Sequence, residues 1–146
     1  MERHPIRIIL NLSHLMRRAM EQEMTDLELS SAQCRVLGYL WCRADKEKPV
    51  FQRELEAEMK IRRSSVTSVV QLLEKKGLLE RRSARADARQ KELVLTQTGI
   101  EVQRKVIGRM DDMEQRLNGC LTEEEKEWWF RCAAKLERGL KEAEYD

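Results

Sequence analysis

The 146-residue sequence has few aromatic residues, few helix-breaking residues and no long apolar run. Aromatic residues make up 5% of the chain, which is too few for the flat stacking surfaces that bind single-stranded nucleic acid. Two prolines and six glycines leave room for long helices. No run reaches the ~18–20 apolar residues of a membrane span, and the N-terminus lacks the apolar segment of a signal peptide. These absences indicate a cytoplasmic protein that does not act in a membrane.

The sequence also lacks the residue clusters that hold metals. Its cysteines are Cys34, Cys42, Cys120 and Cys132, with no Cys-x-x-Cys pair, and its two histidines lie near the N-terminus. Since zinc needs four convergent ligands, usually at short spacings, we expect no metal site and no cofactor. We expect the thiols to be reduced and mostly buried. A redox-sensing thiol is the alternative, suggested only by the arginines that follow Cys34 and Cys42.

Catalytic groups are equally scarce. No nucleophile, base and orienting group occur in a recognisable pattern, and no glycine-rich phosphate loop is present. We therefore predict no catalytic residues and no enzyme activity. The length suits a single domain over residues 1–146, and the mixture of 41% hydrophobic and 37% charged residues suits a helix-rich fold.

Charge is concentrated in the middle of the chain. Residues 60–91 contain ten basic and three acidic side chains, a net charge of +7, whereas residues 92–146 contain nine basic and thirteen acidic ones, a net charge of −4. Such a basic centre favours binding to a polyanion, although a solvated charged face is the alternative.

Apolar spacing predicts helices on both sides of this centre. A stripe of Ile, Leu and Met predicts a helix over about Pro5–Met24. Ser30 and Gln33 form a capping box for a second helix that ends near Arg43. Long helices are expected over Gln97–Leu117 and from a second capping box at Thr122 to Glu142.

The basic centre itself predicts two helices and a hairpin. Val50–Met59 forms a short amphipathic helix and Ser64–Lys76 a second one, so the pair reads as a helix-turn-helix. The second helix has one apolar face, and on its other face small polar residues that can approach base edges in a major groove. Leu78–Arg82 and Lys91–Thr96 alternate as strands around a polar connection with basic residues, and arginines at such a tip suit a narrow minor groove.

Four segments resemble the signature of the MarR family. They are Leu72–Arg81 at a helix end, Asp87–Lys91 with its D-x-R pattern, Leu93–Gly99 with its L-x-LT-x-x-G pattern, and Leu29–Gln33, which is similar to the family's LT-x-x-Q helix entry. The resemblance implies a mainly α fold with a small β-hairpin wing (α+β). It also implies a winged helix-turn-helix over 30–96, and N- and C-terminal dimerisation helices over 1–29 and 97–146.

The same resemblance implies a homodimer that reads successive major grooves of a pseudo-palindromic operator. Arg89 is the expected minor-groove arginine, and Asp87 is expected to orient a neighbouring guanidinium. The DNA-contacting residues predicted in all are Arg62, Arg63, Ser64, Ser65, Thr67, Ser68, Gln71, Lys75, Arg82, Arg85, Asp87, Arg89 and Lys91. Two departures matter: Glu56 stands where the family often has Ala, and Arg62 with Arg63 makes the turn more basic than usual.

The predicted function is a sequence-specific, double-stranded-DNA-binding transcriptional regulator, a repressor released by a small ligand or oxidant. His14, Arg18, Tyr39 and Trp41 are candidates for a ligand cleft, with ordinary surface or interface roles as the alternative. A winged-helix protein-interaction module without operator binding is the competing function, and a metal-sensing repressor is disfavoured by the scattered Cys and His. The terminal helices could instead simply cap the domain.

Overall fold

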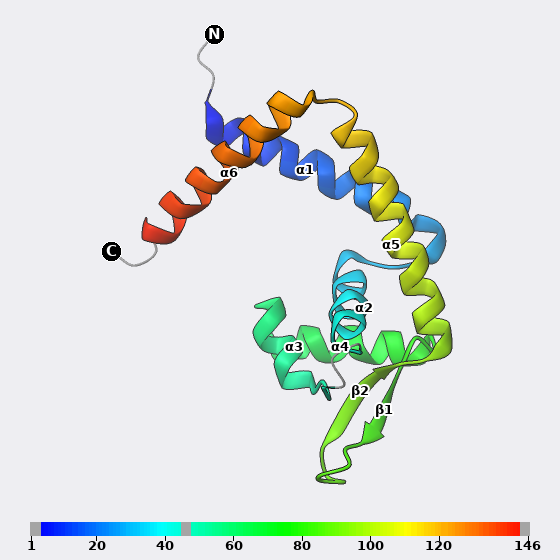
Figure 1. Ribbon diagram of the computed structural model, residues 1–146. Helices are drawn as coiled ribbons and strands as arrows, with labels where there is room; N and C mark the ends of the chain where they lie inside the picture. Colours follow the sequence, from blue (N-terminus) through cyan, green and yellow to red (C-terminus); the bar gives the residue numbers. More distant parts are fainter. Residues whose placement is uncertain (1–3, 45–47, 144–146) are drawn as a thin grey trace. The chain divides into compact units, whose positions relative to one another are not determined.

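The computed structural model describes residues 4–44 and 48–143, which form six α-helices, one 3-10 helix and two β-strands (Figure 1). The predicted fold class, mainly α with a β-hairpin, is confirmed. Contacts divide the chain into one unit that ends at Gly108 and a second that begins at Arg109, and each is described by itself. A single domain over 1–146 stays a prediction.

The first unit begins with α1 (Pro5–Glu23), a short 3-10 helix (Thr25–Leu27) and α2 (Ser31–Ala44). The predicted capping box at the start of α2 is confirmed, because the backbone N–H of Gln33 donates to the Ser30 hydroxyl (3.2 Å) and that of Ser30 to the Gln33 side chain (3.0 Å). The apolar stripe of α2 is buried, and Val36 and Leu37 have no exposed surface.

Helices α3 (Gln52–Met59) and α4 (Arg63–Lys75) form the helix-turn-helix. Lys60, which caps α3, has a φ of 51°, in the left-handed region that reverses the chain sharply. Helix α4 ends before Gly77, whose φ of +72° suits a glycine. Val66, Val70 and Leu73 on α4 have no exposed surface, so the predicted apolar face packs into the core.

Helix α3 begins at Gln52, two residues later than predicted at Val50. The physical reason is a contact with the hairpin: the Leu93 N–H donates to the Val50 carbonyl (2.7 Å), and Phe51 forms a β-bridge with Glu92. Val50 and Phe51 therefore extend alongside the hairpin instead of turning into the helix.

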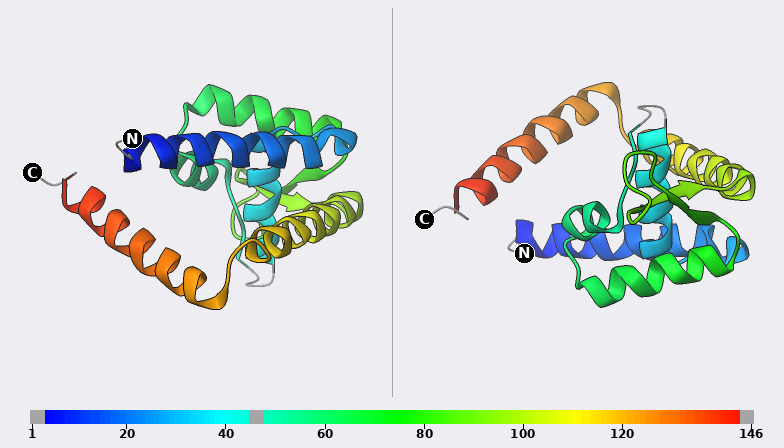
Figure 2. Two further views of the ribbon diagram at one scale, coloured as in Figure 1. Left: turned by 90° about the horizontal axis from the view of Figure 1, so that it is seen from above. Right: turned by 90° about the horizontal axis from the view of Figure 1, so that it is seen from below.

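Strands β1 (Leu79–Ser83) and β2 (Lys91–Leu95) form the antiparallel wing hairpin, in a register that pairs Leu79 with Leu95 and Ser83 with Lys91. The buried residues Leu79, Leu93 and Leu95 fix the hairpin to the core, whereas its far end is exposed. Figures 1 and 2 show the hairpin beside α2, with its turn projecting beyond α3 and α4.

The start of α5 (Gln97–Asn118) is joined to the hairpin by Thr96. Its hydroxyl donates to the Gly77 carbonyl (2.5 Å) and accepts from the Gly99 N–H (3.0 Å), so it caps the helix. A Cβ atom on Gly99 would lie 1.9 Å from the Leu78 carbonyl oxygen, so only glycine fits where α5 passes the residue that precedes β1.

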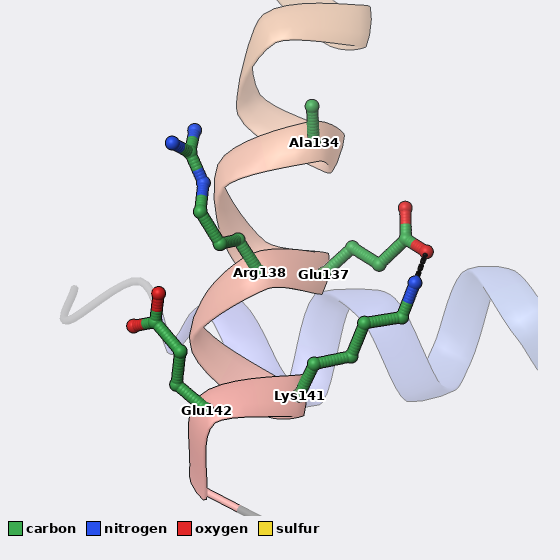
Figure 3. A pocket seen from close by; sticks show the side chains of 5 residues that line it. All are labelled: Ala134, Glu137, Arg138, Lys141 and Glu142. Atoms are coloured by element: carbon green, nitrogen blue, oxygen red, sulfur yellow. Dashed lines mark hydrogen bonds and ion pairs between the residues drawn. The ribbon is translucent and has the colours of Figure 1, made fainter.

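The second unit contains the end of α5 and α6 (Glu123–Ala143). The predicted capping box of α6 is confirmed: the Glu125 carboxylate accepts from the Thr122 N–H (2.8 Å) and hydroxyl (3.1 Å), and these bonds lower the pKa of Glu125. A shallow surface hollow of about 350 Å³ on α6 has all its lining residues on this one helix, and Figure 3 shows its ion pair between Glu137 and Lys141.

Candidate nucleic-acid interface

The outward face of α4 carries the small polar residues that the sequence predicted for base contact. Ser64, Ser65, Ser68 and Gln71 are exposed, whereas the valines of the opposite face are buried or half-buried. The Ser68 hydroxyl donates to the Ser64 carbonyl (3.0 Å), so its lone pairs still face outward as acceptors. Lys75 is also exposed, near the other end of the same helix.

Thr67 differs from its neighbours because it is half-buried and already bonded. Its hydroxyl donates to the Arg63 carbonyl (3.0 Å) and accepts from the Gln52 side-chain amide (2.7 Å) on α3. Gln52 also donates to Glu56 (3.4 Å), and the Glu56 carboxylate lies 3.6 Å from Nε of Arg63. The structure thus turns Thr67 and Arg63, both predicted as DNA contacts, partly towards α3.

Arg62, by contrast, is exposed at the N-cap of α4. Within the described part of the chain, no hydrogen bond or ion pair engages its guanidinium, nor those of Arg85 and Arg89 in the hairpin connection. These three cations, like that of Lys75, are available to phosphate or to a groove without first giving up a partner.

The hairpin turn is ordered by Asp87, in a way that differs from the prediction. Its carboxylate accepts from the backbone N–H of Arg89 (2.9 Å), and its carbonyl accepts from the Gln90 N–H (3.1 Å). The expected bond to a neighbouring guanidinium is replaced by this Asx-type turn, because a short acidic side chain reaches the amide two residues on. Asp87 therefore sets the path of the backbone that carries Arg89.

Two predicted DNA contacts in the strands have partners within the hairpin. Arg82 pairs with Glu80 on the same strand, and Nζ of Lys91 donates to the Ser83 hydroxyl across the strands (2.7 Å). Beside them, Arg81 pairs with Glu74 of α4 (3.4 Å). The hairpin's basic charge is thus partly compensated near its base and uncompensated towards its turn.

A groove of about 770 Å³ lies between the hairpin, the end of α2 and the segment that enters α3. Its apolar floor includes Leu40, Val50 and Leu93, and Arg82 with Arg85 lies at its border. The four residues predicted to line a ligand cleft do not line it.

Those four residues have separate surroundings in the described structure. Tyr39 lies under the guanidinium of Arg43 (5.2 Å to the ring centre), and Trp41 lies under that of Arg104 on α5 (5.9 Å). His14 and Arg18 are exposed on α1. Among the described residues, no hydrogen bond, ion pair or ring contact joins the α1 pair to the α2 pair, so the predicted cleft stays a prediction.

The expectation of mostly buried thiols is wrong for the chain as described: Cys42, Cys120 and Cys132 are exposed and only Cys34 is half-buried. Burial raises the pKa of the Cys34 thiol, an effect that a backbone hydrogen bond reduces. Cys34 therefore lacks the thiolate character that a redox sensor needs at neutral pH. Arg43, the arginine beside Cys42 that suggested a redox-sensing thiol, lies over the ring of Tyr39.

Two features of residues 4–44 and 48–143 bear on other functions. No group of three or more His, Cys, Asp or Glu side chains is placed to hold a metal ion. None of the described helices combines the length and the apolar character that crossing a membrane requires.

Sequence reasoning missed Gln52 and Phe51 as parts of this interface. Gln52 is one helical turn before Glu56, and this spacing could have indicated a shared polar face on α3. The pairing of Phe51 with Glu92 spans about forty residues and leaves no local pattern in the sequence.

Comparison with known proteins agrees with this geometry. Residues 27–90 match the sequence profile of the MarR family. The comparison with curated protein sequences finds no significant match.

Solved structures of Staphylococcus aureus MepR resemble the whole chain. The crystal structure of MepR, a transcription regulator of the multidrug efflux pump MepA, shares 25% identity at a TM-score of 0.81 and covers 94% of this chain and 99% of that one. A MepR–DNA complex shares 25% identity at a TM-score of 0.77, covering 94% and 96%. MepR bound to ethidium bromide shares 25% at a TM-score of 0.66, with the same coverage.

Proposed function

We propose that the chain, whose residues 27–90 match the MarR family profile, is a winged helix-turn-helix regulator of this family, and that it binds double-stranded DNA as a homodimer and represses transcription until a ligand or an oxidant releases it. One observation carries the DNA-binding proposal. The small polar face of α4 and the uncompensated arginines of the hairpin turn are both exposed, within the same unit. The relative MepR, solved in complex with DNA, supports the same assignment.

Each of these two elements suits one groove of the duplex. A major groove about 12 Å wide admits one helix, and there Ser64 and Ser65 can bond to base edges while Gln71 pairs bidentately with adenine. Arg85 and Arg89 suit a narrow minor groove, whose enhanced negative potential attracts guanidinium groups. Arg62 and Lys75 would bond to phosphates and fix the register.

The homodimer proposal rests on exposed apolar side chains at both ends of the chain. On α1, Ile6 and Leu10 are 74% and 65% exposed, and on α6, Phe130 and Leu140 are 67% and 70% exposed. Monomers rarely leave so many large apolar side chains in water, which supports burial against a second copy. A two-fold partner also supplies the second half-site, about 34–36 Å away.

The most detailed part of the proposal is the release of DNA by a ligand or an oxidant. MepR has been solved with ethidium bound, and a ligand that releases DNA must bind the DNA-free conformation more tightly. We assign the ligand contacts to His14, Arg18, Tyr39 and Trp41, of which Trp41 offers a half-buried ring for an aromatic cation. Cys42, Cys120 and Cys132 are exposed thiols that an oxidant can reach.

In vitro selection of bound duplexes tests the function directly. We expect enrichment of a pseudo-palindromic motif, and a Gln71→Ala variant that loses preference at one base position per half-site at a cost of about 1–3 kcal/mol. Gln115→Ala, which removes an exposed amide from α5, is the matched control. A selection that enriches no sequence would exclude operator binding and leave the protein-interaction module as the function.

Ligand binding is measured on the DNA-free protein, because ethidium also intercalates into duplexes. Ethidium fluorescence should rise on addition of the wild type and the Trp128→Ala control, and rise much less with Trp41→Ala. Equal titrations for both tryptophan variants would remove Trp41 from the proposed cleft.

A further inference from the structure

We propose that Glu56 competes with DNA phosphate for the guanidinium of Arg63, and so limits the sequence-independent part of DNA affinity. This inference rests on the proposed function and assigns a role to a residue that faces away from the bases. Glu56 stands at the helix-turn-helix turn, where Lys60, Arg62 and Arg63 gather three positive charges within four positions.

Four side chains close a ring between α3 and α4. Gln52 and Glu56 are one turn apart on α3, and Arg63 and Thr67 are one turn apart on α4. Gln52 bonds to Glu56 (3.4 Å) and to Thr67 (2.7 Å), Thr67 bonds to the Arg63 carbonyl (3.0 Å), and Glu56 pairs with Arg63 (3.6 Å). The ring therefore fixes the Glu56 carboxylate beside the first residue of the helix proposed to read DNA.

The two members of the ion pair are exposed to very different extents. The Glu56 side chain is 25% exposed, whereas that of Arg63 is 85% exposed. The carboxylate is thus held by its neighbours, while the guanidinium can reach outward to a phosphate. A carboxylate so placed draws the Arg63 guanidinium back from an approaching phosphate.

The role of Thr67 follows from the same ring. Its hydroxyl already donates one bond and accepts another within the protein, so it positions α4 against α3 rather than reading a base. Base reading then rests on Ser64, Ser65, Ser68 and Gln71, whose side chains are exposed.

The size of the effect follows from the exposure of Arg63. Exposed ion pairs contribute little, so removing the carboxylate should raise DNA affinity only about two- to fivefold. The gain should be equal for operator and for a duplex of random sequence, because phosphate contacts do not read sequence. The salt dependence should steepen by up to about one counterion.

The test is Glu56→Gln, which removes the charge and keeps an acceptor for Gln52. Glu58→Gln removes an equal charge from the same helix at an exposed position and is the matched control. Affinities for the selected operator and for a random-sequence duplex are measured across salt concentrations by fluorescence anisotropy. We expect the gain for Glu56→Gln, a smaller one for Glu58→Gln, and none for Glu56→Gln in an Arg63→Ala background.

The proposal would be overturned by a loss of affinity in Glu56→Gln, by a gain equal to that of Glu58→Gln, or by a gain that persists without Arg63. A gain confined to the operator would also contradict it, since Glu56 would then act on base reading. If the wild type binds neither duplex, the proposed function fails. If the wild type binds both with a steep salt dependence and Glu56→Gln is unchanged, only this inference fails.

Discussion

Gly99 shows how one residue joins the wing to the helix that follows it. The L-x-LT-x-x-G pattern over Leu93–Gly99 was the basis of a family resemblance, and the structure supplies its physical content. Thr96 caps α5, and Gly99 passes so close to the Leu78 carbonyl that no Cβ atom fits between them. Thr96 and Gly99 are both needed because the start of α5 lies within van der Waals distance of Leu78, just before the hairpin.

We expect Gly99→Ala to destabilise the fold by about 1–3 kcal/mol, because the added methyl group must displace backbone. Gly108 lies on the same helix with open space around its Cβ position, so Gly108→Ala should be neutral or stabilise by up to about 1 kcal/mol. Urea denaturation followed by circular dichroism measures both. Equal stabilities for the two variants would mean that the backbones separate at little cost.

The raised pKa of the half-buried Cys34 thiol predicts unequal cysteine reactivity. Iodoacetamide reacts with thiolate, so at neutral pH it should modify the exposed Cys42 faster than the half-buried Cys34. Cys34 labelling should accelerate only above the ordinary thiol pKa of 9.0. Since the unfolded chain then releases this proton more readily than the folded one, Cys34 should also lower stability as the pH rises through that range. Peptide mass spectrometry of timed samples follows each site, and Cys34 labelled as fast as Cys42 would contradict the burial argument.

At the residue scale, local contacts were predictable from the sequence and distant ones were not. The two capping boxes join residues three positions apart, so spacing alone reveals them. The bond from Gln52 to Thr67 spans fifteen positions, and it appears only once the turn brings α3 and α4 together. The sequence shows that Glu56 stands where the family often has Ala. It does not indicate that Arg63 is the partner of Glu56, because that contact also forms only when α3 and α4 come together.

At the scale of elements, the sequence located the six α-helices and two strands of the described residues, but it missed the 3-10 helix (Thr25–Leu27) and the position where α3 begins. Helical periodicity and turn residues are local properties, so the spans of α2, α4 and the hairpin follow from them. The start of α3 depends on Phe51 pairing with Glu92 of the hairpin, a contact between distant segments that takes these residues out of the helix. The Asp87 carboxylate likewise accepts from the backbone amide of Arg89, whereas the sequence suggested a guanidinium as its partner.

The wing gives the sharpest prediction at this scale. Arg89 is exposed at the hairpin turn and held in place by the Asp87 bond to its backbone, so Arg89→Ala should weaken operator binding and lower the salt slope by about one unit. Arg138→Ala removes the same charge from α6, where Figure 3 shows its side chain extending from the helix, and is the control. Anisotropy titrations across salt concentrations measure the slope. A slope unchanged by Arg89→Ala would remove the wing from the DNA contacts.

At the scale of the whole molecule, the exposed apolar faces of α1 and α6 predict self-association. The double variant Ile9→Glu, Leu140→Glu should weaken the dimer at least tenfold, because fully burying each aliphatic side chain contributes about 1.5–3 kcal/mol and a carboxylate there is unpaired. Lys135→Glu changes charge at an exposed position of α6 and should leave the dimer intact. Light scattering across protein concentrations gives the mass, and a wild-type monomer at micromolar concentration would exclude the dimer.

The hydrogen bond between Leu93 and Val50 has a consequence for the DNA rather than for the protein. It joins the wing to the segment that leads into the helix-turn-helix. We therefore expect the distance between the wing and the helix-turn-helix to stay fixed. A duplex whose twist does not match that spacing must itself deform, at a cost of about 1–6 kcal/mol for smooth bending. Operators should therefore differ in affinity according to the stiffness of base steps that no side chain touches.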